Sequence, residues 1–344
     1  MSRPRALVRG MGVGLAALAC SSACSGEAFH LSESRQPNAN APDAGDFPAL
    51  VTNSTHHDAD SPPQQGAGGS TSTVTSDAGP DAAEPVAVVP QLGPCGEQRT
   101  PSEALADAEV CVPAGGFSMG SGAAPRPGYL AHGPAHSVTL SAYFLDAYEV
   151  TVARYRRCVD AGSCAAAGVN PTLSCTYTLE PADHERHPVT CVSWQSASDF
   201  CAWDGGRRLP SEAEWERAAR NDAGSKYPWG ETFGCDLAVL AGAAQCQSYA
   251  GQLPQPVGSA PAGVSRDGAF DLVGNAAEWV ADWFGGYSVA SVSDPTGPST
   301  GSARIQRGGG WSTPPADGTS YGRRAEAPAA SGGFSFRCAR AAQP

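Results

Sequence analysis

The sequence predicts one α+β domain that has a high loop content and is stabilised by disulfides. Three stretches with apolar residues at helical spacing begin at Thr151, Ser193 and Ser211. The chain contains 41 glycines and 29 prolines, which interrupt it with turns, above all after Asn221. Ten of the 12 cysteines lie between Cys95 and Cys338, an even number that indicates a disulfide framework.

Two segments predict strands ahead of the first helix. Residues 111–120 form a short strand that leads into glycine-rich turns. Residues 137–145 alternate apolar and polar side chains, as a strand with one buried face does. Its apolar positions are Val138, Leu140, Tyr143 and Leu145.

The three helices have recognisable starts. Thr151 is the expected N-cap of the first helix, which continues through Val159. Residues 193–203 form the second helix, and residues 209–220 the third. In the third, Ser211 is the cap and Glu214 completes a capping box. The second helix has one apolar stripe, made of Trp194, Ala197, Phe200 and Cys201. Short strands and loops are expected after Asn221.

Residues 1–19 have the features of an export signal: three arginines, an apolar run and small residues at the end. Cys20 follows them as the expected lipidation site, with Cys24 as a second candidate and ordinary cleavage after Ala19 as the alternative. The apolar run is too short to span a membrane, so we expect attachment through a lipid. The sequence thus predicts an exported protein, lipid-anchored in the cell envelope, in the periplasm or at the cell surface.

Residues 20–94 predict a disordered tether rich in Ser, Pro, Ala, Gly and acidic side chains. The folded domain is expected over residues 95–344. Formal net charge is −12, and removal of residues 1–19, which carry three arginines and no acid, makes it −15. A negative surface argues against nucleic acid as a partner.

Structural disulfides are the expected role of the ten cysteines in the domain, although sequence alone leaves many pairings open. No CxxC pair is present, so a zinc site is not expected. Local spacing suggests four pairs and leaves Cys201 and Cys338 over. The four are Cys95–Cys111, Cys158–Cys164, Cys175–Cys191 and Cys235–Cys246.

Several ordered motifs resemble the formylglycine-generating enzyme family, also called sulfatase-modifying factor domains. They are GGRRLPSEAEWERAAR (205–220), YPWG (227–230), GAFDLVGNAAEW (268–279), RGGGW (307–311) and FRCAR (336–340). FSMGS (117–121) and HPVTCVSW (187–194) stand in the expected order, and the resemblance covers about residues 108–341. It implies a loop-rich fold related to the C-type lectin fold. It also implies a Cys201–Cys338 disulfide.

The resemblance further implies an oxidase that converts a substrate cysteine to formylglycine with two cysteines that hold copper(I). Those cysteines follow the RGGSW element, where this chain has residues 312–315 and 317–321 without a cysteine. The serine of that element is Gly310 here. A hydroxyl does not replace a thiolate on copper(I), so neither copper nor formylglycine-generating activity is expected.

A remodelled loop over the former active-site groove is the expected result. It would offer its side chains to a peptide, a glycan or another envelope protein. The candidate groove residues are Trp311, Thr313, Ser320, Tyr321, Arg323 and Arg324.

Asn275 and Glu278, in VGNAAEW, place two hard oxygen donors three residues apart on a tight turn, which suits Ca²⁺. In the family this motif contributes to a structural calcium site. The alternative is that Asn275 caps the turn and Glu278 pairs with an arginine. A second calcium site has only Asp236 as a plausible side-chain ligand.

Other chemistry has weaker support in the sequence. A metal triad of His132, His136 and His184 would suit a metal-dependent oxidoreductase with an altered centre, the second hypothesis for function. Glu212, Glu214 and Glu216 resemble a carboxylate site, but Glu214 is expected in the capping box and Glu216 beside Arg217 or Arg220. The first hypothesis is a binding or structural module that keeps the scaffold without the oxidase.

Overall fold

The computed structural model describes residues 95–99, 102, 106–123, 132–170, 174–220, 224–241 and 253–342. These residues belong to one compact unit, Ala82–Pro344. The predicted signal peptide, the tether, Cys20, Cys24 and Cys246 lie outside the described residues. No helix among the described residues has the length and apolar character that a membrane crossing requires.

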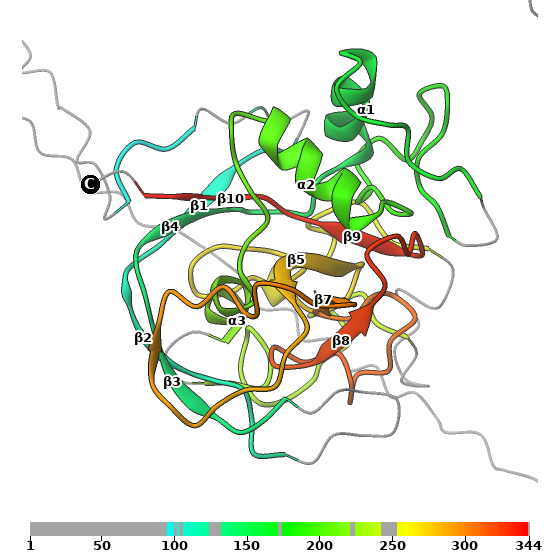
Figure 1. Cartoon of the computed structure of the whole chain (residues 1–344). Helices are drawn as coiled ribbons and strands as arrows, with labels where there is room; N and C mark the ends of the chain where they lie inside the picture. The colour runs from blue at the N-terminus through cyan, green and yellow to red at the C-terminus, as the bar shows by residue number, and fades with distance from the viewer. Residues whose placement is uncertain are drawn as a thin grey trace, which may run out of the picture. The chain divides into compact units, whose positions relative to one another are not determined.

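The strands form three small sheets (Figure 1). The first has the order β1 (Glu109–Val112), β4 (Tyr143–Asp146), β10 (Ala339–Ala341). The second has the order β2 (Gly115–Met119), β3 (His136–Leu140), β6 (Val292–Ser293). The third has the order β8 (Arg323–Glu326), β7 (Arg304–Arg307), β5 (Ala277–Trp283), β9 (Phe334–Phe336). A short 3-10 helix, η2, covers Pro261–Gly263. The predicted α+β architecture with much irregular chain is confirmed.

The prediction of one strand over residues 137–145 is wrong in one respect. The chain breaks at Ser141 and Ala142, so that β3 and β4 belong to different sheets. The carboxylate of Asp294 holds the break, because it accepts hydrogen bonds from the Ser141 N–H at 2.7 Å and the Ser141 hydroxyl at 2.9 Å. The predicted alternation of buried and exposed side chains holds in β3, whereas all four residues of β4 are buried.

The three predicted helices are confirmed. They are α1 (Val152–Asp160), α2 (Trp194–Trp203) and α3 (Glu212–Arg220). Thr151 and Ser193 cap the first two through their hydroxyls. The capping box of α3 is complete, because the Ser211 N–H donates to Glu214 Oε2 at 2.8 Å and the Glu214 N–H donates to Ser211 Oγ at 3.1 Å.

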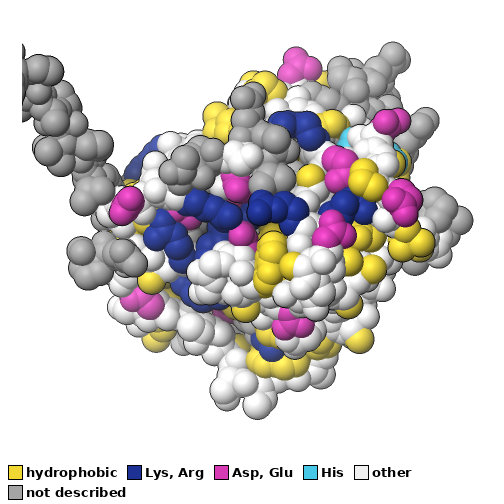
Figure 2. All heavy atoms as spheres, turned by 90° about the horizontal axis from the view of Figure 1, so that it is seen from above, with side chains coloured by type: hydrophobic (Ala, Val, Ile, Leu, Met, Phe, Trp, Pro, Cys, Tyr) yellow, Lys and Arg dark blue, Asp and Glu magenta, His cyan; other side chains and the backbone are white. Residues whose placement is uncertain are grey.

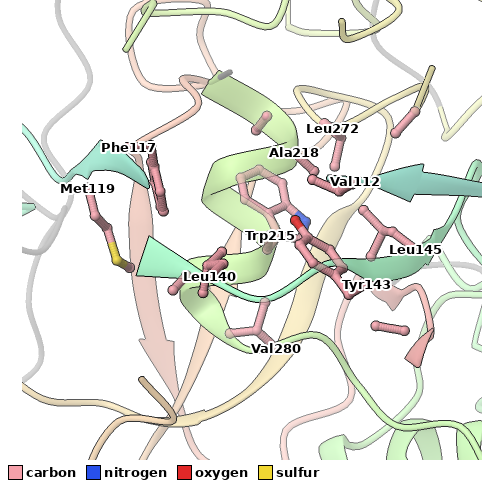
Figure 3. Packing of buried hydrophobic residues seen from close by; sticks show 14 of the residues in the cluster. Val112, Phe117, Met119, Leu140, Tyr143, Leu145, Trp215, Ala218, Leu272 and Val280 are labelled. Carbon is pink, nitrogen blue, oxygen red and sulfur yellow. The ribbon is translucent and has the colours of Figure 1, made fainter. Parts of the chain in front are cut away.

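Helix α3 lies at the centre of the main core (Figure 3). Every residue of α3 is buried, and the fully buried Trp215 lies in one cluster with Tyr143, Leu140 and Val280. The Tyr143 hydroxyl donates to the Glu214 carbonyl at 2.5 Å, which ties β4 to the helix. The third sheet and the β2–β3 hairpin pack against the same helix, so α3 positions both.

A second core lies between α1, α2 and the β5–β9 edge, as Figure 1 shows in its upper half. Tyr155, Phe200 and Phe336 form its aromatic centre, with the Tyr155 and Phe200 rings stacked at 5.6 Å. The Cys201–Cys338 disulfide is buried in this core and links α2 to the segment between β9 and β10.

The predicted disulfides are confirmed for the described cysteines. They are Cys95–Cys111, Cys158–Cys164, Cys175–Cys191 and Cys201–Cys338. Cys235 is also disulfide-bonded, while its predicted partner, Cys246, lies outside the described residues.

Candidate functional site

The RGGGW element carries the chain from β7 across the start of β5. Gly308 has a φ of +82° and lies so close to Leu272 that an added Cβ would meet its carbonyl oxygen at 2.7 Å. The Trp311 N–H then donates to the Asn275 carbonyl at 2.9 Å. The ring of Trp311 packs on Gly333, where any side chain would overlap it. These glycines place the following loop, residues 312–322, beside the VGNAAEW turn.

Thr313 and Ser320 stand in the two segments where the resemblance has copper-binding cysteines. Thr313 is 5% exposed and its hydroxyl accepts a hydrogen bond from the Gly310 N–H at 3.0 Å. Ser320 is 0% exposed and its hydroxyl donates to the Ala219 carbonyl at 3.2 Å. Both hydroxyls therefore hold the loop against its neighbours, and the residues present do not fit a copper(I) ion.

Gly310 occupies the position of the family serine. A Cβ there would meet Ala277 N at 3.2 Å and Asn275 O at 3.3 Å, which is tight but not prohibitive. Its backbone has an ordinary conformation, unlike Gly308. The loss of the serine hydroxyl is therefore a change of chemistry and is not forced by the backbone.

Beside this loop the described residues form a depression of about 10 Å³, the size of one water molecule, between Gln306, Asp317 and Arg324. Trp311, Tyr321 and Arg324 are partly exposed. The Tyr321 ring contacts His132 at 4.9 Å, and Arg220 lies over it at 5.3 Å.

The expectation that Arg323 is available to a ligand in this groove needs correction. Arg323 is 2% exposed, and its guanidinium binds both oxygens of Glu212, at 2.8 and 2.7 Å. Its remaining nitrogen donates to the Gly285 carbonyl at 3.0 Å. The physical reason is that α3 carries three buried glutamates, whose charges require buried partners.

Glu216 is the second of these glutamates. It is fully buried and pairs with Arg307 of the RGGGW element and with Arg220 at 2.9 Å. The prediction that Glu216 pairs with Arg220 is thus confirmed, and Arg307 is a further partner. The arginine of RGGGW therefore fixes the closing segment, residues 307–340, to α3.

At the VGNAAEW turn, both predicted calcium ligands bind other parts of the protein, and the alternative that Glu278 pairs with an arginine is present. Glu278 accepts from Arg337 at 2.7 Å on each oxygen and from Trp215 Nε1 at 2.9 Å. Asn275 has a φ of +55°, and its Oδ1 accepts from the Gln255 N–H at 2.8 Å. Calcium at this pair stays a prediction, and Glu278 would have to share its oxygens with Arg337.

Two more buried carboxylates surround this turn. Glu149 accepts from Asn275 Nδ2 and from the Ala276 N–H, both at 3.1 Å. Burial, together with Asp271 and Glu278, raises the pKa of Glu149 well above its usual value. Burial also raises the pKa of Asp271 to about 6. Three carboxylates face one arginine, so the cluster has an excess of negative charge that a bound cation would stabilise.

The histidine triad is wrong as a metal site. His184 packs against His187 at 4.8 Å, whereas His132 lies on Tyr321 and His136 lies on Tyr287 at 5.0 Å. Within the described part of the chain, no three His, Cys, Asp or Glu side chains are placed to hold a metal ion. A calcium ion at the VGNAAEW turn would accordingly depend on amide and backbone oxygens as well.

Two larger cavities among the described residues lie on either side of residues 294–298. One of about 230 Å³ is lined by Ser141, Arg208, Glu214 and Asp294. The other, of about 270 Å³, is lined by Glu212, Asp282 and Tyr287. Sequence reasoning missed Asp282, although an acid among the apolar residues Val280, Ala281 and Trp283 is the signal that could have identified it.

Comparison with known proteins identifies the class. Residues 97–342 match the family described as "Sulfatase-modifying factor enzyme 1-like domain", and the chain belongs to this family. It is 31% identical over 285 residues to the formylglycine-generating enzyme of Streptomyces coelicolor, an alignment that covers 67% of this chain and 88% of the relative.

Two further relatives show the range of the family. The chain is 32% identical over 250 residues to the serine/threonine-protein kinase Pkn1 of Chlamydia trachomatis, covering 67% of this chain and 38% of the kinase. It therefore spans well under half of that protein. The structure of PvdO from Pseudomonas aeruginosa superposes with a TM-score of 0.58 at 27% identity, covering 71% of this chain and 99% of PvdO.

Proposed function

We propose that this protein is an exported, lipid-anchored envelope protein whose sulfatase-modifying factor domain does not generate formylglycine. Its domain acts as a binding or structural module for an envelope protein, a peptide or a glycan. The anchor is Cys20, and residues 20–94 tether the domain to the membrane. Calcium at Asn275 and Glu278 is a structural part of the same proposal.

The observation that carries the proposal is that hydroxyl groups, those of Thr313 and Ser320, stand in the two segments where the family has copper-binding cysteines. Copper(I) requires soft thiolate ligands, and the two positions offer hydroxyls that already take part in hydrogen bonds within the domain. Each cysteine in the described residues is disulfide-bonded, so none of these supplies a thiolate from elsewhere in the fold.

Two further features support a binding role. The loop between Trp311 and Arg323 is kept and fixed by buried ion pairs, although its cysteines are absent. On the face seen in Figure 2, basic side chains lie across the middle, with acidic side chains next to them. Such a surface suits a protein, peptide or glycan better than the phosphate backbone of a nucleic acid.

Metal analysis and an activity assay on the full-length protein test the loss of the oxidase. We expect no stoichiometric copper or iron, and no oxygen consumption or formylglycine with a cysteine-containing sulfatase peptide. The Streptomyces coelicolor relative, assayed in parallel, is the positive control. Stoichiometric redox metal with thiol-dependent oxygen consumption would instead establish the alternative, a metal-dependent oxidoreductase of this family with an altered centre.

Calcium is tested by thermal unfolding at about pH 7.5. Because the cluster around Asn275 has excess negative charge, we expect added Ca²⁺ to raise Tm and a chelator to lower it. An unchanged Tm would show that Arg337 and bound protons neutralise the cluster without a metal. Mass spectrometry of the mature N-terminus distinguishes a lipid on Cys20 from one on Cys24.

A further inference from the structure

The cavity of about 270 Å³ lies between the β2–β3 hairpin, the N-terminus of α3 and the segment after β5. In Figure 1 this segment, drawn in orange, runs beside β2 and β3, and its strand β6 pairs with β3. Glu212 and Ala213, at the start of α3, line this cavity, whereas Ser320 of the loop binds the Ala219 carbonyl near the end of the helix. Its volume suits a ligand of fragment size.

Apolar side chains form most of the cavity wall. They are Met119, Trp283, Tyr287, Val292 and Pro298. The hydroxyl of Tyr287 is buried and has no hydrogen-bond partner among the described residues. A buried hydroxyl of this kind is an uncompensated polar group in the wall.

Asp282 is the acidic group of the cavity. It is 4% exposed, and its Oδ2 accepts from the Glu212 N–H at 2.8 Å, which caps α3. Its Oδ1 lies beside Gly297, where an added Cβ would stand 2.8 Å away. None of the ion pairs recorded for the described residues involves Asp282.

The other charges at this site are already neutralised. Glu212 and Arg323, which also line the cavity, bind each other through two hydrogen bonds. Arg323 is therefore not available to an anion, and the unbalanced charge of the cavity is the carboxylate of Asp282. An apolar pocket with one unpaired acid is complementary to a cation with an apolar body.

We propose that this cavity binds a small organic amine, with the protonated nitrogen on Asp282 and the apolar part against Trp283 and Tyr287. The cavity of about 230 Å³ on the other side of the loop provides the contrast. Its acids are occupied, since Asp294 holds Ser141 and Glu214 binds Arg208 at 2.6 and 2.7 Å.

The pH dependence follows from the surroundings of Asp282. Burial, with Glu212 and Glu214, raises the pKa of Asp282 to about 7, while Arg323 opposes this rise. Arg208 and Arg304 also act on Asp282 electrostatically, and His136 is the titratable group on the β3 side of the cavity. A cation binds the ionised carboxylate, so its affinity should rise about tenfold from about pH 6 to about pH 8.

Ligand-observed NMR and calorimetry with the full-length protein test the proposal. The probes are phenethylamine, its neutral isostere 2-phenylethanol and the anion 3-phenylpropionate. We expect phenethylamine to bind with a dissociation constant in the millimolar range or below, and the neutral and anionic probes to bind at least about tenfold more weakly.

Asp282→Asn keeps an oxygen that can cap α3 but removes the charge, so we expect it to weaken phenethylamine about tenfold or more. Asp294→Asn, the same change on the neighbouring loop outside the cavity, is the matched control and should leave binding unchanged. Ser288→Trp, at the exposed part of the lining, should block binding without touching the α3 cap.

Equal binding by the three probes, equal binding by Asp282→Asn, or no binding of phenethylamine would each overturn the proposal. The inference rests on the proposed function, because it gives a binding module a ligand class. The two fail separately: loss of amine binding leaves the absence of oxidase activity untouched, whereas redox metal and thiol oxidation would overturn the proposed function alone.

Discussion

Single residues of α3 carry charge into the centre of the domain, and the closing segment supplies the charges that neutralise them. Glu216 binds Arg307, and Glu212 binds Arg323, all four side chains being almost fully buried. Such pairs contribute little net stability relative to an apolar core, but the removal of one partner leaves a buried charge that is very costly.

Glu216→Gln tests this dependence. It leaves Arg307 and Arg220 without their carboxylate, so we expect a loss of about 3 kcal/mol in the free energy of unfolding, measured by urea denaturation. Glu180→Gln, the same change at an exposed position, should have almost no effect. Equal stability of the two variants would show that these buried ion pairs do not hold the closing segment.

The buried carboxylate of Asp271 should make the stability of the domain depend on pH. Burial raises its pKa to about 6 in the folded protein, above the value of an unfolded aspartate. The folded state therefore binds the extra proton, and its stability falls as pH rises from about 4 to about 6 and then levels off. Asp271→Asn keeps an acceptor for the Gly258 N–H and removes the charge.

Without added calcium, we expect Asp271→Asn to unfold at a higher temperature than the wild type at about pH 7.5, and the two to converge near pH 4. The gain should be on the order of 2 kcal/mol at neutral pH. Calorimetry across this pH range measures it, and a difference independent of pH would contradict the assignment to Asp271.

At the scale of elements, the chain repeatedly needs glycine where segments cross. Gly308 combines a positive φ with a position so close to the Leu272 carbonyl oxygen that a Cβ would meet it at 2.7 Å. Gly310, two residues later, lies outside the left-handed region, and a Cβ there would meet its nearest neighbour at 3.2 Å. The motif thus contains one glycine that the backbone demands and one that it does not.

Gly308→Ala and Gly310→Ala form a matched pair. We expect Gly308→Ala to destabilise the domain by about 2 kcal/mol or more, because the new Cβ meets a backbone oxygen in a left-handed conformation. Gly310→Ala should cost less than about 1 kcal/mol, since neighbouring atoms need to move only slightly. Thermal unfolding compares the stability of the two variants. A larger loss of stability for Gly310→Ala would contradict the close approach of Gly308 to Leu272.

For the whole molecule, disulfides compensate for the small amount of regular structure. Cys158–Cys164 closes a separation of 6 residues and Cys201–Cys338 one of 137. In the chain-entropy model, the longer loop restricts the unfolded chain much more. Cys201–Cys338 also lies in the second core, where it fixes α2 to the end of the domain.

Replacement of each pair by alanines should therefore have unequal effects. We expect the Cys201→Ala/Cys338→Ala variant to lose about 3 kcal/mol more in unfolding free energy than Cys158→Ala/Cys164→Ala. Denaturant unfolding of both double variants measures the difference. Equal losses would indicate that native packing, and not the unfolded chain, determines what these bridges contribute.

Much of the fold followed from local signals in the sequence. The three helix starts and the capping box of Ser211 and Glu214 depend on neighbours along the chain, and they are confirmed. The same holds for three of the four short-range cysteine pairs, while Cys235–Cys246 stays a prediction. The break between β3 and β4 was missed because Asp294, far away in sequence, creates it. The burial of Arg323 was missed for the same reason, since its partner Glu212 lies on another element.

The sequence by itself determined the family, through the motifs on both sides of the closing segment, and the absence of cysteines between Trp311 and Arg323. Only the tertiary structure decided that Thr313 and Ser320 hold this loop through hydrogen bonds and that Glu278 binds Arg337. It also placed Asp282 in a separate cavity, without an ion pair among the described residues. The physical reason is that residue identity and short-range spacing are written along the chain. The partners that neutralise a buried charge come from distant segments and are known only once the chain has folded.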